Sequence, residues 1–234
     1  MKYLYAKYTD IGARQTNEDS LGIQSWNSTL LAVVADGLGG HSNGEIASRI
    51  AVDTILSKLY RQDLDEDSLA YAIIDASHSI RKNSDSGFST AAALWIQDGH
   101  AVAAHIGDSR IYQFRNGKII YQTLDHSLVQ MAVLVGKLKP DALRNHPDRN
   151  QLFRVLGDHD EDPKIDSTEL SVQAGDHFLL CSDGFWEHVT ESDMISTASE
   201  SNDPGIWLES MKTILCKTQS ANQDNHTAIC IIIS

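Results

Sequence analysis

The stretch LLAVVADGLGGHSNGE, residues 30–45, decides how this chain folds. Residues 30–35 carry no polar side chain, and Asp36 and Gly37 follow them directly. A short apolar run bounded by Asp and Gly is typical of a buried β-strand. The segment therefore predicts a buried strand that ends on an anion, and the position of that anion calls for a physical explanation.

Several other segments share this pattern and extend the prediction to whole sheets. Aliphatic or β-branched runs predict strands over 31–36, 90–97, 101–108, 110–122, 177–183 and 227–234. The pairs Asp98-Gly99 and Asn116-Gly117 predict tight hairpin turns, because these residues tolerate the positive φ that such turns require. Hairpins of this kind make the sheets mainly antiparallel.

Helices are predicted where apolar residues recur with a period of 3.6. This holds for 44–60, for 67–83 with Asp67 or Ser68 as the N-cap, and for 203–217. The predicted fold class is α+β, with two packed, mainly antiparallel sheets (a β-sandwich) flanked by helices. The polar region 126–165 predicts short helices and loops that form a flap within a single domain spanning 1–234.

Composition excludes several classes of protein. The 234 residues carry a net charge of −13, which argues against sequence-independent nucleic-acid binding and against docking to an anionic membrane. Three cysteines without paired spacing suggest neither a disulfide framework nor a zinc cluster. The start MKYLYAKYTD lacks the apolar core of a signal peptide, so a cytoplasmic protein is expected.

Carboxylates stand at the ends of apolar segments in five separate parts of the chain, at Asp36, Asp108, Asp183, Asp224 and the pair Glu18-Asp19. A single Asp-Gly after a strand is most often a turn residue. As a set, however, anions gathered at one rim of a sandwich would repel one another unless a cation neutralised them. Oxygen ligands without His or Cys are those preferred by Mg²⁺ and Mn²⁺. The set therefore predicts a divalent metal centre.

Eight motifs in order resemble those of the metal-dependent protein phosphatase family, the protein phosphatase 2C-like Ser/Thr phosphatases in their compact bacterial form. They are GARQTNEDS, VVADGLGGHSNGEIAS, STAAAL, AHIGDSRIY, DHSL, RVLG, LLCSDGFWEHV and DNHTAICI. The resemblance runs from about residue 6 to the end of the sequence. It implies a β-sandwich with two Mn²⁺ or Mg²⁺ ions at one end, and a third ion as in bacterial members.

The resemblance also implies a role for each metal ligand. Asp36 matches the carboxylate that bridges both ions, and Gly37 matches the residue that offers its carbonyl to one of them. Asp183 and Asp224 match ligands of the other ion. Asp108 matches a ligand of the weaker third ion, shared with Asp183.

Four further residues match positions around the ions. Glu18 and Asp19 match acids that hold metal-bound water, and Asn225 matches a polar partner near the site. Arg14 matches the arginine that binds the substrate phosphate, where a guanidinium can make two parallel hydrogen bonds. Leu38 departs from the family, which commonly has Met or His there, and leucine cannot donate a proton to a leaving group.

The function implied is hydrolysis of phosphorylated Ser/Thr proteins by water that the ions activate, without a phosphoenzyme. The chain is expected to be a monomer that opposes a Ser/Thr kinase. Within enzymes, the alternative is a phosphatase acting on a phosphorylated regulator in a signalling switch. A non-catalytic metal-binding regulator is a further alternative, but it would be expected to lose Asp36, Asp183 or Asp224. His41 is interpreted as a structural or solvated residue.

Overall fold

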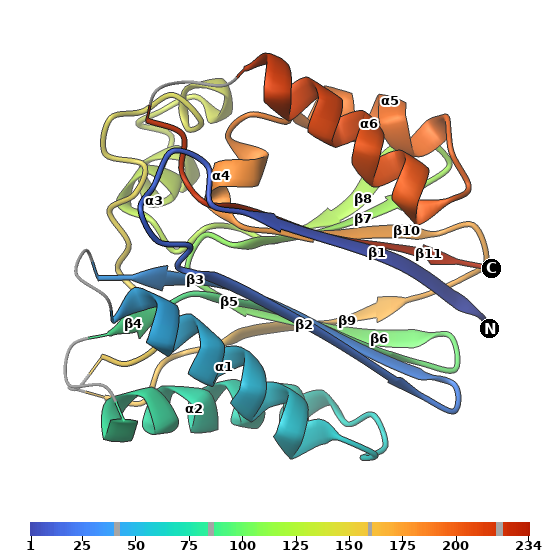
Figure 1. Ribbon diagram of the computed structural model, residues 1–234, viewed down its shortest axis with the longest axis horizontal. Helices are drawn as coiled ribbons and strands as arrows, with labels where there is room; N and C mark the ends of the chain where they lie inside the picture. Colours follow the sequence, from blue (N-terminus) through green and yellow to red (C-terminus); the bar gives the residue numbers. More distant parts are fainter. Residues whose placement is uncertain (40–42, 84–86, 159–160, 219–221) are drawn as a thin grey trace.

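Two β-sheets pack face to face, and helices cover their outer faces (Figure 1). The computed structural model describes residues 1–39, 43–83, 87–158, 161–218 and 222–234. The first sheet has the strand order β1 (Tyr3–Asp10), β11 (His226–Ile233), β10 (His177–Cys181), β7 (Arg110–Arg115) and β8 (Lys118–Gln122). The second has the order β2 (Asp19–Trp26), β3 (Thr29–Leu38), β5 (Ala91–Gln97), β6 (His100–Ile106) and β9 (Asp166–Ser171), and β4 (Phe88–Ser89) pairs with β3.

All strand pairings among the described residues are antiparallel. Helices α1 (Gly44–Leu59) and α2 (Glu66–Asn83) cover the second sheet, at the bottom of Figure 1. The first sheet packs against α4 (Asp183–Trp186), α5 (Glu191–Ser199) and α6 (Pro204–Lys217). Between β8 and β9 lie α3 (Leu128–Leu134) and a 3₁₀ turn, Pro140–Ala142. The predicted α+β sandwich is confirmed.

Strand β3 is buried on both faces, which explains its unbroken apolar run. Successive side chains of a strand point to opposite faces. Accordingly, Leu30, Ala32 and Val34 pack between the sheets. The alternate residues Leu31, Val33 and Ala35 belong to the core under α1 and α2. Asp36 is the next residue on the inter-sheet face, so the strand carries its carboxylate directly to the end of the sandwich.

Asp36 lies within β3 rather than at its end, which corrects the predicted boundary. The strand continues to Leu38 because Gly37 and Leu38 pair with Ser89 and Phe88. The strand predicted over 101–108 ends earlier, at Ile106, and the one predicted over 177–183 ends at Cys181 because Asp183 begins α4. The two predicted hairpin turns are confirmed, with positive φ at Asp98, Gly99, Asn116 and Gly117.

The strands that the sequence did not predict are the two-residue β4 and the longer β1, β2 and β9. Each of these three longer strands lies at the edge of a sheet. Their side chains alternate only weakly between buried and exposed, so they lack the apolar runs of central strands. The predicted N-cap of α2 is also wrong. Asp65 caps the helix instead, since its Oδ2 accepts a hydrogen bond from the backbone N–H of Ser68 at 3.1 Å.

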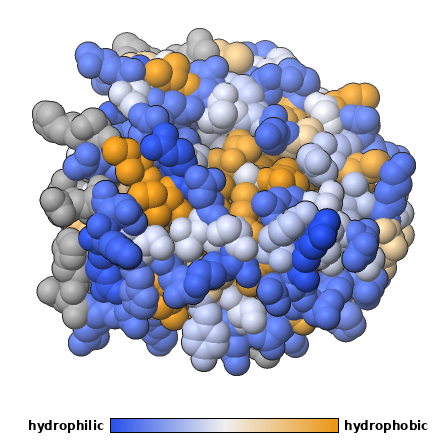
Figure 2. All heavy atoms as spheres, turned by 60° about the horizontal axis from the view of Figure 1, so that its bottom comes forward, coloured by the Kyte–Doolittle hydropathy of each residue, from blue (hydrophilic) through white to orange (hydrophobic). Residues whose placement is uncertain are grey.

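On the face shown in Figure 2, hydrophilic side chains predominate and the hydrophobic ones gather in limited areas. Among the helices of the described residues, none combines the length and apolar character needed to cross a bilayer.

The segment after β8 is fixed to the second sheet by His126. Its backbone N–H donates to Gly107 O at 2.9 Å, and its Nδ1 accepts from the N–H of Gly107 at 3.1 Å. The imidazole stacks on that of His105, with ring centroids 4.7 Å apart. Burial, followed by the neighbouring His105, lowers the pKa of His126 to about 4. His126 is therefore neutral in the folded protein at neutral pH.

Replacing Asp203 should test the cap of α6. Its Oδ1 accepts from the backbone N–H groups of Gly205 and Ile206 at 2.8 and 3.0 Å. Asp203→Ala should lower the free energy of unfolding in urea by about 1 kcal/mol, whereas Asp203→Asn, which keeps the acceptor, should lose much less. Equal losses in the two variants would contradict this role.

His126 should make the fold less stable in acid. Its pKa is about 4 when folded and about 6.5 when unfolded, so the unfolded state takes up the proton first as the pH falls. This destabilisation is negligible well above pH 6.5, and at pH 5 it should lower the free energy of unfolding by about 2 kcal/mol. The free energies of unfolding of wild type and His126→Gln are measured at pH 7.5 and at pH 5. The difference between the two proteins should change by that amount, because only wild type is destabilised by the histidine. A difference between the two proteins that does not change with pH would refute this.

Candidate metal centre

A cavity of about 550 Å³ opens at one end of the sandwich. Its walls come from the loop before β2, the end of β3, the turn after β6, the start of α4 and the segment before β11. The lining contains most of the predicted site residues, namely Arg14, Glu18, Asp36, Gly37, Asp108, Asp183, Asp224 and Asn225. Leu38, Asn150 and Leu152 also line it. The fold thus brings together carboxylates that lie up to 206 residues apart in the sequence.

Asp19 is the predicted residue that does not line the cavity. It pairs with Asp36 in the register of β2 and β3 and is almost fully buried behind the cavity. Ser182 Oγ donates to its Oδ2 at 2.7 Å. Its other oxygen, Oδ1, has no hydrogen-bond partner among the described residues.

The backbone around Asp36 is held from both sides. Its N–H donates to Thr90 Oγ1 at 2.9 Å, and its carbonyl accepts from the N–H of Thr90 at 2.8 Å. The N–H of Gly37 donates to Glu18 O at 3.1 Å. A Cβ at Gly37 would lie 2.1 Å from Gly44 O, so only glycine fits there. These contacts fix where the Asp36 carboxylate and the Gly37 carbonyl lie.

Crowding and burial raise the pKa of the carboxylates. The pKa of Asp36 is raised well above its usual value, first by burial and then by Asp19, Asp183 and Asp108. The pKa of Asp183 is also raised well above its usual value, first by burial and then by the charge of Asp108. Burial raises the pKa of Asp108 to about 7 and that of Asp19 to about 6. The cluster therefore binds protons unusually strongly, as expected of buried acids that lie close to one another.

These residues fit divalent cations that also take water. Within the described residues, no three His, Cys, Asp or Glu side chains converge as a ready metal cage. Mg²⁺ usually keeps several waters and binds through one or two carboxylates, so such a cage is not required. Among the residues that the structure describes, Oδ1 of Asp19 and Oδ1 of Asp108 have no hydrogen-bond partner, and the lining holds no His or Cys. Both observations match a hard, oxygen-ligated ion.

Arg14 is the cation of the cavity rim. Its Nη2 donates to Asp224 Oδ2 at 2.7 Å, and about half of its side chain is exposed. The hydrogen bond to Asp224 is the main reason why the pKa of Arg14 is raised. Behind it, Asn225 ties the Arg14 loop to β11, because Nδ2 donates to Ile11 O and Thr16 O while Oδ1 accepts from the N–H of Glu18.

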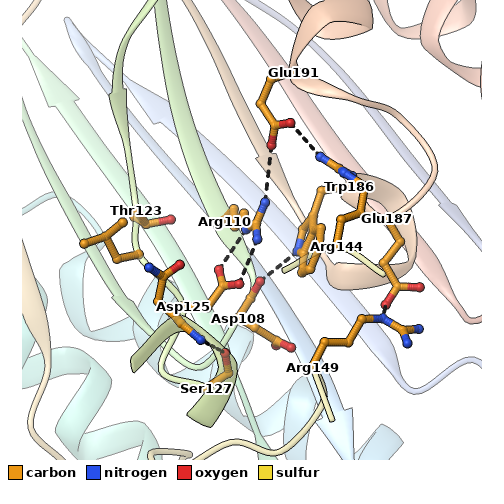
Figure 3. A network of polar contacts seen from close by, with 12 residues as sticks. Asp108, Arg110, Thr123, Asp125, Ser127, Arg144, Arg149, Trp186, Glu187 and Glu191 are labelled. Atoms are coloured by element: carbon orange, nitrogen blue, oxygen red, sulfur yellow. Dashed lines mark hydrogen bonds and ion pairs between the residues drawn. The ribbon is translucent and has the colours of Figure 1, made fainter. Parts of the chain in front are cut away.

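Arg110, buried beside the cavity, organises a network that the sequence did not predict (Figure 3). Its guanidinium makes two parallel hydrogen bonds of 2.7 Å to Asp125 and lies 3.5 Å above the ring of Trp186. The indole N–H of Trp186 in turn donates to Asp108 O at 2.9 Å. The sequence does place Arg110 two residues after Asp108. Its partners Asp125 and Trp186, however, lie further along the chain, so no local pattern indicated the network.

Two ion pairs in the same view connect the segment between α3 and β9 to the first sheet's helices. Arg144 Nη2 donates to Glu191 Oε2 at 2.7 Å, and Arg149 pairs with Glu187. Arg149 precedes the cavity residue Asn150. These pairs hold the segment against the mouth of the cavity.

Asp224 is also supported from its backbone side. Its carbonyl accepts a hydrogen bond from His226 Nδ1 at 2.9 Å, so this nitrogen carries the proton. His226 Nε2 therefore accepts from the hydroxyl of Tyr8, 3.1 Å away. The predicted His41 lies outside the described residues.

The chain is similar to bacterial Ser/Thr phosphatases in sequence. It is 32% identical to the serine/threonine protein phosphatase PstP of Mycobacterium tuberculosis over 238 residues, covering 96% of this chain and 44% of PstP. It is 33% identical to the serine/threonine phosphatase stp of Listeria monocytogenes, covering 80% of this chain and 79% of that protein. The chain thus spans less than half the length of PstP and most of the length of stp.

The structure of this chain is also similar to that of PstP. A crystal structure of the catalytic domain of PstP in complex with two manganese ions superposes with a TM-score of 0.81 at 25% identity, covering 99% of both chains. The family model described as protein phosphatase 2C matches residues 8–215. The chain therefore belongs to the protein phosphatase 2C family.

Proposed function

We propose that this chain is a metal-dependent Ser/Thr phosphoprotein phosphatase that uses two Mn²⁺ or Mg²⁺ ions, with a third at Asp108 and Asp183. The observation that carries the proposal is the group of buried, mutually repelling carboxylates around one open cavity. Such a group stores an electrostatic cost that divalent cations would relieve. The manganese-bound PstP structure and the named phosphatases among the relatives support the same assignment.

When bound, the ions would supply a nucleophilic water near neutral pH and neutralise charge on the phosphoryl oxygens. The chain's residues then have separate tasks. Asp36 would hold both ions, the Gly37 carbonyl would hold one of them, and Asp183 and Asp224 would hold the other. Glu18 and Asp19 would orient water. These residues are held by hydrogen bonds before any ligand arrives, which lowers the reorganisation required during the reaction.

Arg14 would bind the phosphate of the substrate. Its guanidinium lies at the exposed rim and is paired with Asp224. The two parallel N–H groups of Arg14 would donate to phosphoryl oxygens, and a cation bound at Asp224 would weaken the competing ion pair. Leu38 lines the cavity but cannot protonate the leaving serine or threonine oxygen, so that proton has to come from water or another group.

The single-domain organisation, the flap over 126–165, the monomeric state, the cytoplasmic location and a kinase as the opposing enzyme belong to this proposal as well. Arg144 and Arg149 support the flap, because their ion pairs hold this segment at the cavity mouth. One alternative is a phosphatase that acts on a single phosphorylated regulator in a signalling switch. A non-catalytic metal-binding protein is the other, and the presence of Asp36, Asp183 and Asp224 argues against it.

Asp36→Asn should abolish Mn²⁺-dependent hydrolysis of p-nitrophenyl phosphate, with a loss of about a thousandfold or more in kcat. The fold should persist, because the backbone contacts of Asp36 do not involve its carboxylate. The matched control is Asp53→Asn, on the exposed face of α1, which should keep full activity. Turnover by Asp36→Asn equal to that of wild type would sink the proposed function.

Metal should also stabilise the fold. At a hundred times the dissociation constant, Mn²⁺ should add about 2.7 kcal/mol to the free energy of unfolding, and excess EDTA should remove that gain. Asp183→Asn should reduce the gain, since it removes one ligand and part of the repulsion. Thermal or urea unfolding with and without Mn²⁺ provides the measurement, and an identical response of wild type and Asp183→Asn would speak against Asp183 as a ligand.

A further inference from the structure

Exposed apolar side chains gather on one short segment of the structure. Of the thirteen large hydrophobic side chains exposed in the described part of the chain, six lie between residues 124 and 153. Four of these form one side of α3 and its C-cap, each 45–60% exposed: Leu128, Met131, Leu134 and Val135. We call these four residues the α3 apolar face. Large hydrophobic groups clustered in this way usually mark a binding surface.

The α3 apolar face is not needed for folding. The opposite side of the helix, with Val129 and Val133, already packs into the core that contains Leu138 and Leu143. The helix LVQMAVL is therefore apolar on both sides, although only one side is covered. A helix that is hydrophobic all round is normally buried. The uncovered side consequently lacks a packing partner within the described chain.

The α3 apolar face is connected directly to the mouth of the cavity. The N–H of Leu128 donates to Gln151 O at 2.9 Å, and Ser127 forms a β-bridge with Leu152. Leu152 and the neighbouring Asn150 line the cavity. On its other side, Leu134 and Val133 border a groove of about 480 Å³, which Leu124, Leu143, Arg144 and Glu191 also line. A chain lying on α3 would thus be within a few residues of the carboxylate cluster.

The charge around the α3 apolar face indicates what kind of partner segment would bind there. Although the whole protein carries a net charge of −13, residues 124–154 contain five Lys or Arg and three Asp. Lys137 and Lys139 directly follow α3, are exposed, and form no ion pair within the described residues. A partner with apolar residues flanked by acidic ones would complement this surface. A short acidic-flanked segment contacts only this local surface, whereas an anionic membrane is broad and would also face the acidic remainder of the molecule. A second copy would bring its own Lys137 and Lys139 to the same face, and residues 128–139 contain no acid to complement them.

We propose that the α3 apolar face, with Lys137 and Lys139 at its end, docks an apolar, acidic-flanked segment of the phosphoprotein substrate close to its phosphorylated residue. This inference rests on the proposed function and specifies its substrate class. The surface raises the affinity for protein substrates, while the phosphoryl chemistry stays at the cavity. Small phosphate esters, which do not reach α3, are therefore insensitive to it.

The test compares β-casein, an acidic phosphoprotein with apolar segments, with p-nitrophenyl phosphate. Leu134→Glu and the milder Leu134→Gln should lower kcat/KM for β-casein by about tenfold, mainly through KM, and leave p-nitrophenyl phosphate within about twofold. Lys137→Glu with Lys139→Glu should cause a smaller, salt-dependent loss. Ile206→Glu, a comparably exposed residue on α6, is the matched control and should change neither substrate.

A binding measurement separates this inference from the proposed function. Surface plasmon resonance of β-casein on metal-free protein should show binding that Leu134→Glu weakens and Ile206→Glu does not. If wild type hydrolyses neither substrate but the binding result holds, the phosphatase assignment fails and the docking surface stands. If wild type is active but Leu134→Glu affects neither binding nor β-casein turnover, the docking surface is refuted.

Two other occupants would overturn the inference. Light scattering that shows a wild-type dimer and a Leu134→Glu monomer would assign the α3 apolar face to self-association. Sedimentation with phosphatidylserine-containing vesicles that Leu134→Glu abolishes would assign it to a membrane. Circular dichroism of each variant checks that α3 and the sandwich remain folded.

Discussion

Repulsion between carboxylates confined at one end of a β-sandwich is the constraint on which the rest of this structure depends. Burial raises the pKa of all three acids Asp36, Asp183 and Asp108; Asp183 and Asp108 further raise that of Asp36, and Asp108 further raises that of Asp183. In a protein without a function at this place, such a group would cost stability for no gain. Its presence therefore accounts both for the need for divalent cations and for the amount of hydrogen bonding around it.

The scaffold meets this repulsion mainly through the backbone. Thr90 binds both backbone groups of Asp36, Trp186 binds the carbonyl of Asp108, and His226 binds that of Asp224. These contacts hold Asp36 and Asp108 in position without using their carboxylate oxygens. Asp224 differs, since its Oδ2 accepts from Arg14 and its Oδ1 from the N–H of Asn225. The buried ion pair of Arg110 with Asp125 acts indirectly. The Arg110 guanidinium packs on the ring of Trp186, whose N–H in turn binds the carbonyl of Asp108.

What the sequence predicted, and what it did not, follows from the range of the interactions. Central strands such as β3 and β10 are buried on both faces, so a local run of apolar residues identifies them. Edge strands such as β1 and β9 are half exposed, and their mixed polarity gives no such signal. Four acids of the lining were predictable because Asp36, Asp108, Asp183 and Asp224 each stand next to a recognisable strand. The Arg110 network and the pairing of Arg14 with Asp224 join residues 15 to 210 positions apart, and no local pattern encodes them.

The alternation along β3 has a wider consequence. Val34 and Asp36 are neighbours on one face of the same strand. The hydrophobic core between the sheets is therefore directly continuous with the acidic lining of the cavity. An extended strand advances about 3.3 Å per residue and is stiff over that length. Any change of volume beneath Val34 would therefore shift a charged oxygen about two residues away. Substitutions of the interior at Val34 are therefore constrained by the position of the Asp36 carboxylate as well as by packing.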